Sequence, residues 1–260
     1  MSALDQFFFG YFPYICLTVF LLGSLVRFDR EQYSWKTGSS QLLRQRQLRW
    51  GSNLFHIGIL VIFFGHLFGL LVPMPVFDAI GVGHSAKQIL AIVVGGLAGI
   101  ATFIGLTMLL HRRLFDPRIR RTSSFGDISV LVLLYVQLIL GMATIPISLG
   151  HLDGSVMVKF MAWAQGIFTF EAGVAAYVAD VHPIFKLHLV LGMALFLVFP
   201  FTRLVHVWSA PVWFLGRRGY QIVRTGRSRS AFAPRSEEAS KAVRPAAGRA
   251  SGTKKPAAAE

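Results

Sequence analysis

The sequence has little cysteine and little charge, and each shortage excludes classes of protein. Its single cysteine, Cys16, excludes a disulfide framework, a cysteine-based zinc site and an iron–sulfur cluster ligated by this chain alone. Charged residues make up 15% of the 260 residues, whereas an average soluble chain carries about 25%. Because 54% of the residues are apolar, the chain lacks the polar surface that a water-soluble domain needs.

Among the charged residues, acidic ones are the scarcer, with 12 Asp+Glu against 26 Lys+Arg and a net charge of +14. Such an excess is typical of nucleic-acid-binding proteins or of membrane proteins with basic loops, and the positions of the charges decide between them. A helix that crosses a bilayer needs about 20 apolar residues. Five stretches meet this need, namely residues 7–26, 51–75, 89–110, 128–149 and 184–208. We therefore expect an all-α integral membrane protein, namely a five-helix transmembrane bundle. Its partner is expected to be the lipid bilayer and not a nucleic acid.

The basic residues alternate between the connections. The first connection holds six Lys/Arg, the second only Lys87, the third five, the fourth only Lys159 before Lys186, and the C-terminal tail eleven. By the positive-inside rule, the N-terminus lies outside and the C-terminus in the cytoplasm. We expect residues 1–224 to form the five-span domain and residues 225–260, which have almost no large apolar side chains, to form a disordered basic cytoplasmic tail. No basic region precedes the first stretch, so we expect a retained span and no signal peptide.

A further apolar segment, Val156 to Phe170, lies in the fourth connection. Lys159 and Glu171 leave eleven uncharged residues between them, about half of what a span requires. We expect an amphipathic or re-entrant segment on the outside of the bundle.

Four of the eight histidines lie within the predicted spans, two on the second and two on the fifth. His188 and His206 are 18 residues apart, which is five turns of one face in a continuous helix of about 3.6 residues per turn. The two spans run in opposite directions. His66 and His188 therefore fall near the outside and form the outer pair, while His56 and His206 fall near the cytoplasm and form the inner pair.

Two facing imidazoles are an axial ligand set of low-spin haem b, and bundle cores are where such cofactors bind. The spacing therefore predicts two stacked haem b sites, with helix tilt absorbing the unequal rises of about 15 Å and about 27 Å between the histidines. Packing histidines, a proton relay or a transition-metal transport site remain alternatives. A metal transporter would usually add intramembrane Asp, Glu or Cys ligands, whereas these spans carry no acidic residue and only Cys16.

Six segments resemble, in order, the gamma subunit of membrane-bound respiratory nitrate reductase. They include FDREQYSWKTGSSQ (28–41) and SNLFHIGILVIFFGHLFGLLVP (52–73). The others are residues 7–15, 112–118, 151–165 and 185–212. The resemblance covers about residues 7–224, is poor over residues 74–85, and does not extend into the tail.

The resemblance implies a dihaem cytochrome b of the bacterial cytoplasmic (inner) membrane, with the four histidines ligating two haems in the pairs given above. Such a subunit oxidises quinol or menaquinol from the quinone pool near the outer haem. Its electrons pass to an iron–sulfur beta subunit and then to a molybdenum-containing alpha subunit, which reduces nitrate in the cytoplasm. Two rivals are a dihaem quinone-linked cytochrome b of a sulfur-metabolism or heterodisulfide-type complex, and a non-haem transporter with relay histidines.

The resemblance also implicates Lys87 and Gly65, together with His66, in the quinol site. From the residues alone, Lys87 is placed to donate to a quinone carbonyl or a haem propionate, or else to anchor the chain at the membrane interface. Arg203, three residues before His206, is a propionate partner or a snorkelling side chain. Gly65 and Gly192 either leave room for a flat macrocycle or are helix-packing glycines.

Overall fold

The computed structural model describes residues 2–35 and 43–209, so the predicted tail at 225–260 lies outside the described residues. The described part is helical. Its long elements are α2 (Phe12–Arg30), α3 (Gln45–Leu71), α5 (His84–Phe115), α7 (Phe125–Leu149) and α9 (Pro183–Val198). The short α-helices are α1 (Ala3–Gln6), α4 (Met74–Ala79), α6 (Pro117–Arg121) and α8 (Ser155–Phe168). The π-helix η1 (Phe7–Tyr11) and the 3-10 helices η2 (Gln32–Ser34), η3 (Val174–Val178), η4 (Phe199–Phe201) and η5 (Arg203–Ser209) complete the list.

Five helical segments of the described part are long and apolar enough to cross a membrane. They are Ala3–Arg30, Gln45–Leu71, His84–Phe115, Phe125–Leu149 and Pro183–Phe201. The prediction of an all-α protein with five membrane-spanning helices is therefore confirmed. The second span ends at Leu71, before the expected residue 75, because Pro73 cannot continue the α-helical hydrogen-bond pattern.

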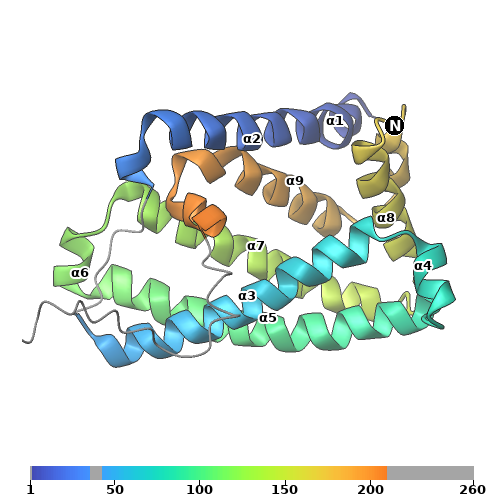
Figure 1. Ribbon diagram of the computed structural model, residues 1–260. Coiled ribbons are helices and arrows are strands. Elements are labelled where there is room, and N and C mark those ends of the chain that lie inside the picture. Colours follow the sequence, from blue (N-terminus) through green and yellow to red (C-terminus); the bar gives the residue numbers. More distant parts are fainter. Residues whose placement is uncertain (1, 36–42, 210–260) are drawn as a thin grey trace, which may run out of the picture. The chain divides into compact units, whose positions relative to one another are not determined.

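Within residues 1–210, the long helices pack in the spatial order α3, α5, α7, α9, α2 (Figure 1). One end of this bundle carries α1, α4 and α8, and we call it the α8 end; the opposite end carries α6, and we call it the α6 end. The closest packing is between α3 and α5, where glycines face backbone. A Cβ at Gly58 would lie 2.7 Å from the Ala98 carbonyl oxygen, and one at Gly105 would lie 2.7 Å from that of Gly51.

The further apolar segment of the fourth connection forms α8, which has 14 residues and is not among the five candidate spans. It buries Trp163 and Ile167. Trp163 Nε1 donates to the Phe9 carbonyl at 2.9 Å. The usual α-helical donor to that carbonyl would be residue 13, and Pro13 has no N–H. Tyr14 Oη donates to the Ile167 carbonyl at 3.1 Å, so two hydrogen bonds join α8 to the first span.

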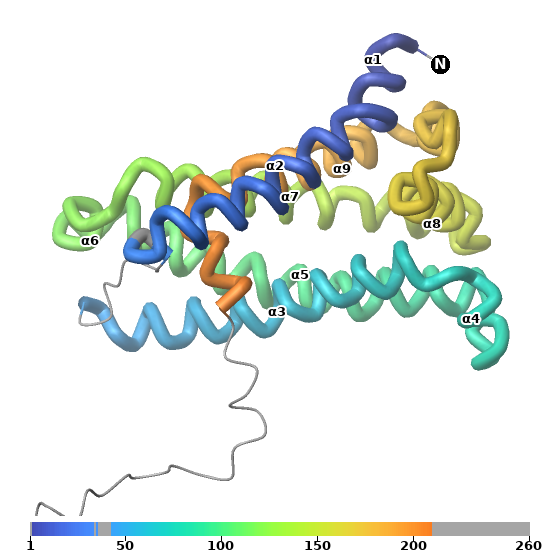
Figure 2. Tube along the Cα trace, turned by 45° about the horizontal axis from the view of Figure 1, so that its top comes forward, coloured from blue at the N-terminus to red at the C-terminus, as the bar shows by residue number. Residues whose placement is uncertain are grey.

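The fifth span differs from the continuous helix expected over residues 184–208. Its α-helix ends at Val198, η4 follows, and Thr202 is extended, with φ −119° and ψ −178°, before η5 begins. Pro200 lacks the N–H that would continue the helix, and its ring clashes with the carbonyl of the preceding turn. Beyond the break, the orange segment that carries η5 turns towards α3 (Figure 2).

Candidate functional site

The outer pair lies near the α8 end. The ring centroids of His66 on α3 and His188 on α9 are 6.2 Å apart, with an interplanar angle of 46°. His66 Nδ1 lies 2.8 Å from the Ile62 carbonyl oxygen. Because a carbonyl can only accept, Nδ1 carries the proton in the neutral ring and Nε2 keeps its lone pair, which is the tautomer that binds a metal.

The inner pair lies towards the α6 end. The ring centroids of His56 on α3 and His206 on η5 are 6.4 Å apart, with an interplanar angle of 75°. Each Nδ1 again faces a carbonyl of its own chain segment. The distance is 2.7 Å from His56 to the Ser52 oxygen and 2.6 Å from His206 to the Arg203 oxygen. Both rings therefore present Nε2 as the free lone pair.

These distances fit one iron between each pair. A metal–imidazole bond is about 2 Å long and the nitrogen lies about 1 Å from the ring centre, so two imidazoles on one iron have centres about 6 Å apart. Within the described residues, no group of three or more His, Cys, Asp or Glu could hold a metal ion. Each pair offers two ligands, which is what a porphyrin needs because its macrocycle supplies the other four.

The two helices that carry the outer pair pack on their neighbours rather than on each other. Among the described residues, α3 packs closely on α5 and α8, and α9 packs closely on α2 and α7, whereas α3 and α9 do not pack closely on each other. His188 Nδ1 is buried and makes no hydrogen bond within the described chain. A buried imidazole whose nitrogen has no hydrogen-bond partner is free to coordinate a metal, which fits the ligand chemistry of haem b.

Helix α7 shapes the surroundings of His188. Gln137 Nε2 donates to the His188 carbonyl at 3.1 Å. A Cβ at Gly141 would lie 3.0 Å from His188 Cε1, so only glycine leaves the ring its present position. The Cβ position of Gly192 faces Gln137 Nε2 at 3.1 Å, which supports the packing role among the alternatives for Gly192. Sequence reasoning missed Gln137, although it is the only amide side chain in its span, and had no signal for Gly141.

Lys87 lies near the start of α5 and is 5% exposed. Its Nζ donates to the Gly69 carbonyl at 2.9 Å, lies 3.0 Å from Met161 Sδ on α8, and sits 3.8 Å from the centroid of the Phe77 ring. Gly69 is three residues after His66, so the structure brings Lys87 to the last turn of α3, beyond the outer pair.

The same turn of α3 takes a second side-chain donor. Gln165 Nε2 on α8 donates to the Leu70 carbonyl at 3.0 Å. The last carbonyls of a helix have no hydrogen-bond donor in the helix itself. Here side chains of α5 and α8 donate to two of these carbonyls. A Cβ at Gly65 would have no atom within 4 Å, so Gly65 borders open space beside His66. Sequence reasoning missed Gln165 and Met161.

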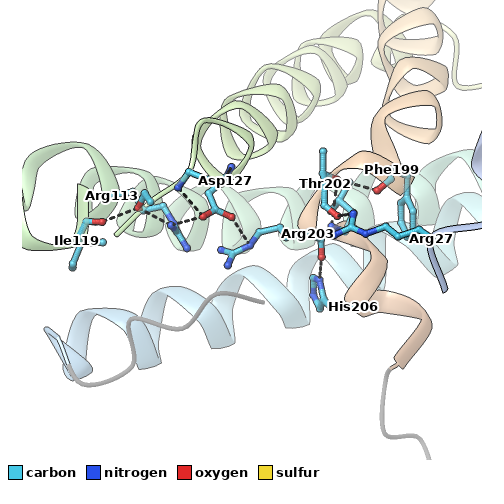
Figure 3. A network of polar contacts seen from close by, with 11 residues as sticks. Arg27, Arg113, Ile119, Asp127, Phe199, Thr202, Arg203 and His206 are labelled. Atoms are coloured by element: carbon cyan, nitrogen blue, oxygen red, sulfur yellow. Dashed lines mark hydrogen bonds and ion pairs between the residues drawn. The ribbon is translucent and has the colours of Figure 1, made fainter. Parts of the chain in front are cut away.

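Arg203 joins a polar network near the inner pair (Figure 3). Its Nε lies 3.0 Å from Asp127 Oδ1 on α7, and Arg113 Nη1 on α5 lies 3.5 Å from Asp127 Oδ2. The Arg203 guanidinium, expected as a propionate partner or a snorkelling group, thus pairs with Asp127. Its backbone carbonyl holds His206 Nδ1.

Two ion pairs lie at the α8 end. Lys186 Nζ at the start of α9 lies 2.8 Å from Asp5 Oδ1 on α1. Lys159 Nζ on α8 lies 2.5 Å from Asp180 Oδ2 in the loop before α9. The hydrogen bond from Lys159 lowers the pKa of the Asp180 carboxyl below its ordinary value.

Comparison with known proteins covers nearly the whole described chain. The family model described as nitrate reductase gamma subunit matches residues 5–226. The respiratory nitrate reductase 2 gamma chain of Escherichia coli K12 is 52% identical over 87% of this chain and 100% of the relative. The respiratory nitrate reductase 1 gamma chain of the same organism is 50% identical over 86% and 99%. The nitrate reductase gamma chain of Bacillus subtilis 168 is 38% identical over 84% and 97%.

Proposed function

The chain belongs to the nitrate reductase gamma subunit family and is a membrane-bound cytochrome b subunit of an oxidoreductase complex, which is the premise on which we propose its function. We propose that the chain oxidises quinol and carries the electrons inward, with two b haems as cofactors. This proposal rests on two imidazole pairs at different positions along the bundle. Their ring centroids are 6.2 Å and 6.4 Å apart, and the helices that carry them do not pack closely on each other.

The four histidines are the proposed haem ligands, with the outer pair holding one haem and the inner pair the other. In each of His56, His66 and His206, a carbonyl hydrogen bond to Nδ1 fixes the tautomer and raises the basicity of Nε2. When bound, the haems supply a one-electron path from one end of the bundle to the other. The protein positions the rings and tunes the sites.

The proposed quinol site comprises Gly65, His66 and Lys87. Gly65 leaves open space beside His66, and the Lys87 ammonium lies one turn further along α3. A quinol hydroxyl oxygen can accept a hydrogen bond from Lys87 Nζ if it replaces the Gly69 carbonyl as acceptor. Oxidation of quinol to quinone releases two electrons to the chain and two protons to the adjacent water.

We propose that the α8 end faces the outside and the α6 end the cytoplasm. The basic residues of α6 and of the preceding segment then lie on the cytoplasmic side, as the positive-inside rule requires. This orientation leaves the protons outside while the electrons move inward, which stores about 2.3 kcal/mol per charge per 100 mV. The proposed recipients are the iron–sulfur beta subunit and, through it, the molybdenum-containing alpha subunit, where nitrate is reduced.

A difference absorption spectrum of the purified membrane protein tests the haem assignment. We expect a b-type band that halves in His66→Ala and in His188→Ala, with the inner haem retained, and that halves in His56→Ala and in His206→Ala, with the outer haem retained. The two variants of one histidine pair should lose the same haem. If they lose different haems, the pairing is wrong. A non-haem transporter would give no band in any sample.

Quinol oxidation tests the second part of the proposal. Lys87→Met removes the proposed donor and should lower quinol oxidation in membranes that retain both haem bands. Lys159→Met, which removes a partly exposed cation of α8 that pairs with Asp180, is the matched control. Co-purification of the full complex then distinguishes nitrate reductase from the heterodisulfide-type rival, because nitrate reduction requires a molybdenum-containing partner. Equal rates in both lysine variants would exclude Lys87 from the quinol site.

A further inference from the structure

The break between α9 and η5 decides where His206 lies. Residues 199–202 leave the α-helical path, and η5 then turns towards α3. A straight continuation of α9 would carry His206 along the axis of α9 and away from the turn that η5 makes. The geometry of the break therefore determines whether His206 can face His56 at 6.4 Å.

Arg27, in the last turn of α2, holds this break. Its Nη1 donates to the Pro200 carbonyl at 2.6 Å and to the Thr202 carbonyl at 2.8 Å, on either side of Phe201 (Figure 3). A helix that ends leaves carbonyls without backbone donors, and a cation is favoured at this end of a helix. One nitrogen of Arg27 thus satisfies two oxygens that the break exposes.

Gly23 makes room for the same break from the same face of α2. A Cβ at this position would lie 2.8 Å from Pro200 Cγ and 3.0 Å from Pro200 Cβ, so a larger residue would push the proline ring away. Gly23 and Arg27 are four residues apart and lie on one face of the helix. Helix α2 therefore contributes both the space for Pro200 and the donor for its carbonyl.

The chain beyond the break is held from the opposite side by α7. Asp127 Oδ1 lies 3.0 Å from Arg203 Nε, and the Arg203 carbonyl accepts from His206 Nδ1 at 2.6 Å. Thr202 Oγ1 accepts from the Leu204 backbone N–H at 3.3 Å and so caps η5. The segment between the break and His206 is thus tied to two spans, and Arg27 provides the link to the first span.

We propose that Arg27 is a positioning residue for the inner haem, with Gly23 as its steric counterpart, because together they set the direction in which η5 presents His206 to His56. The proposal rests on the proposed function, since it needs a haem between these two histidines. It concerns one site only. The outer pair lies on α3 and α9 before the break, so its geometry does not depend on Arg27.

The test compares Arg27→Met, Arg27→Lys and Gly23→Val in the full chain. Arg30→Met serves as the matched control, since Arg30 is exposed three residues further along α2. Redox-titrated absorption and electron paramagnetic resonance resolve the two haems in one sample. Hydrogen exchange with mass spectrometry reports on the backbone of residues 199–209 without relying on haem or activity.

Loss of a group that hydrogen-bonds a metal ligand typically lowers metal affinity about 10- to 100-fold, and Arg27 acts on His206 through the backbone, so its loss should lie at the lower end of this range. We expect Arg27→Met and Gly23→Val to weaken haem retention at the inner site to this extent, to change its ligand-field signals, and to speed exchange over residues 199–209, with the outer haem unchanged. Arg27→Lys, which keeps the charge and three donors, should restore part of the inner signal. Arg30→Met should match the parent protein.

An inner haem with unchanged signals in Arg27→Met overturns the proposal, and so does equal loss of both haems, because the effect would then be global. These outcomes are distinct from a failure of the proposed function. In that case the parent protein would carry no b haem, or its haems would not depend on the four histidines.

Discussion

Gly141 offers a sharp test of how the bundle positions the outer pair. Substitution Gly141→Ala adds a Cβ that would lie 3.0 Å from His188 Cε1 and 3.6 Å from both ring nitrogens. Carbon atoms in good contact are about 3.5–4.0 Å apart, so the imidazole must shift by about half an ångström or more. Gln137 holds the backbone of His188 by its carbonyl, so the ring, rather than α9, is the part that moves.

The size of the effect follows from two opposing terms. Overpacking of this kind costs about 1–3 kcal/mol, whereas replacing glycine by alanine in a helix stabilises it by about 1 kcal/mol. The overall stability should therefore fall by about 0–2 kcal/mol, while the strain is concentrated on one ligand. At about 1.4 kcal/mol per factor of ten, strain of this size lowers retention of the outer haem about 5- to 150-fold.

The assay is redox-titrated absorption spectroscopy of the purified protein, with thermal unfolding measured in parallel. Gly95→Ala is the control, since its Cβ would meet no atom within 4 Å. We expect Gly141→Ala to weaken or shift the outer haem alone, and Gly95→Ala to leave both haems unchanged. The reasoning is refuted if Gly141→Ala retains an outer haem with the spectrum and potential of the parent protein.

Three further predictions concern the α8 end. Trp163→Phe removes the indole donor to the Phe9 carbonyl and should cost about 1–3 kcal/mol; unchanged thermal unfolding would show that the bond is dispensable. Gln165→Met removes a donor from the end of α3 and should shift the outer haem potential; a shift of the inner potential instead would contradict this. Because Lys159 lowers the pKa of Asp180, that carboxylate stabilises the fold above its unfolded-state pKa and loses the effect as pH falls through its folded-state pKa. Asp180→Asn should lower the unfolding temperature at pH 7 and converge with the parent in acid, and a pH-independent difference would argue against the ion pair.

The number of spans could be predicted because hydropathy and charge position determine it. Stretches of about 20 apolar residues must be helical in a bilayer, and five were found. The ends were less accurate, since the third span runs from His84 to Phe115 where residues 89–110 were expected. Pro73 shortened the second span and Pro200 interrupted the fifth, and both prolines were visible in the sequence.

The histidine pairs illustrate a limit of reasoning from spacing. Depth along antiparallel spans predicted which rings meet, and the structure brings the same residues together. The expected reason was a continuous helix from His188 to His206, with tilt absorbing the unequal rises. The structure instead breaks the helix at Pro200. The direction taken after the break depends on Arg27, which is 173 residues away from Pro200 in sequence, and no local pattern encodes that contact.

Other site residues depend on contacts that one sequence does not contain. Lys87 was identified as the only cation of its connection, but its partner Gly69 follows from the packing of α3 on α5. Gly141 matters because α7 crosses α9 at His188. The sequence does not indicate which ring a glycine in a membrane span faces.

The haem content of the purified parent protein tests the central claim most directly. Quantification of haem b against protein, for example as the pyridine haemochrome, should give two haems per chain, one for each histidine pair. If the protein carries one haem or none when haem supply is not limiting, the assignment of both pairs as ligands is contradicted.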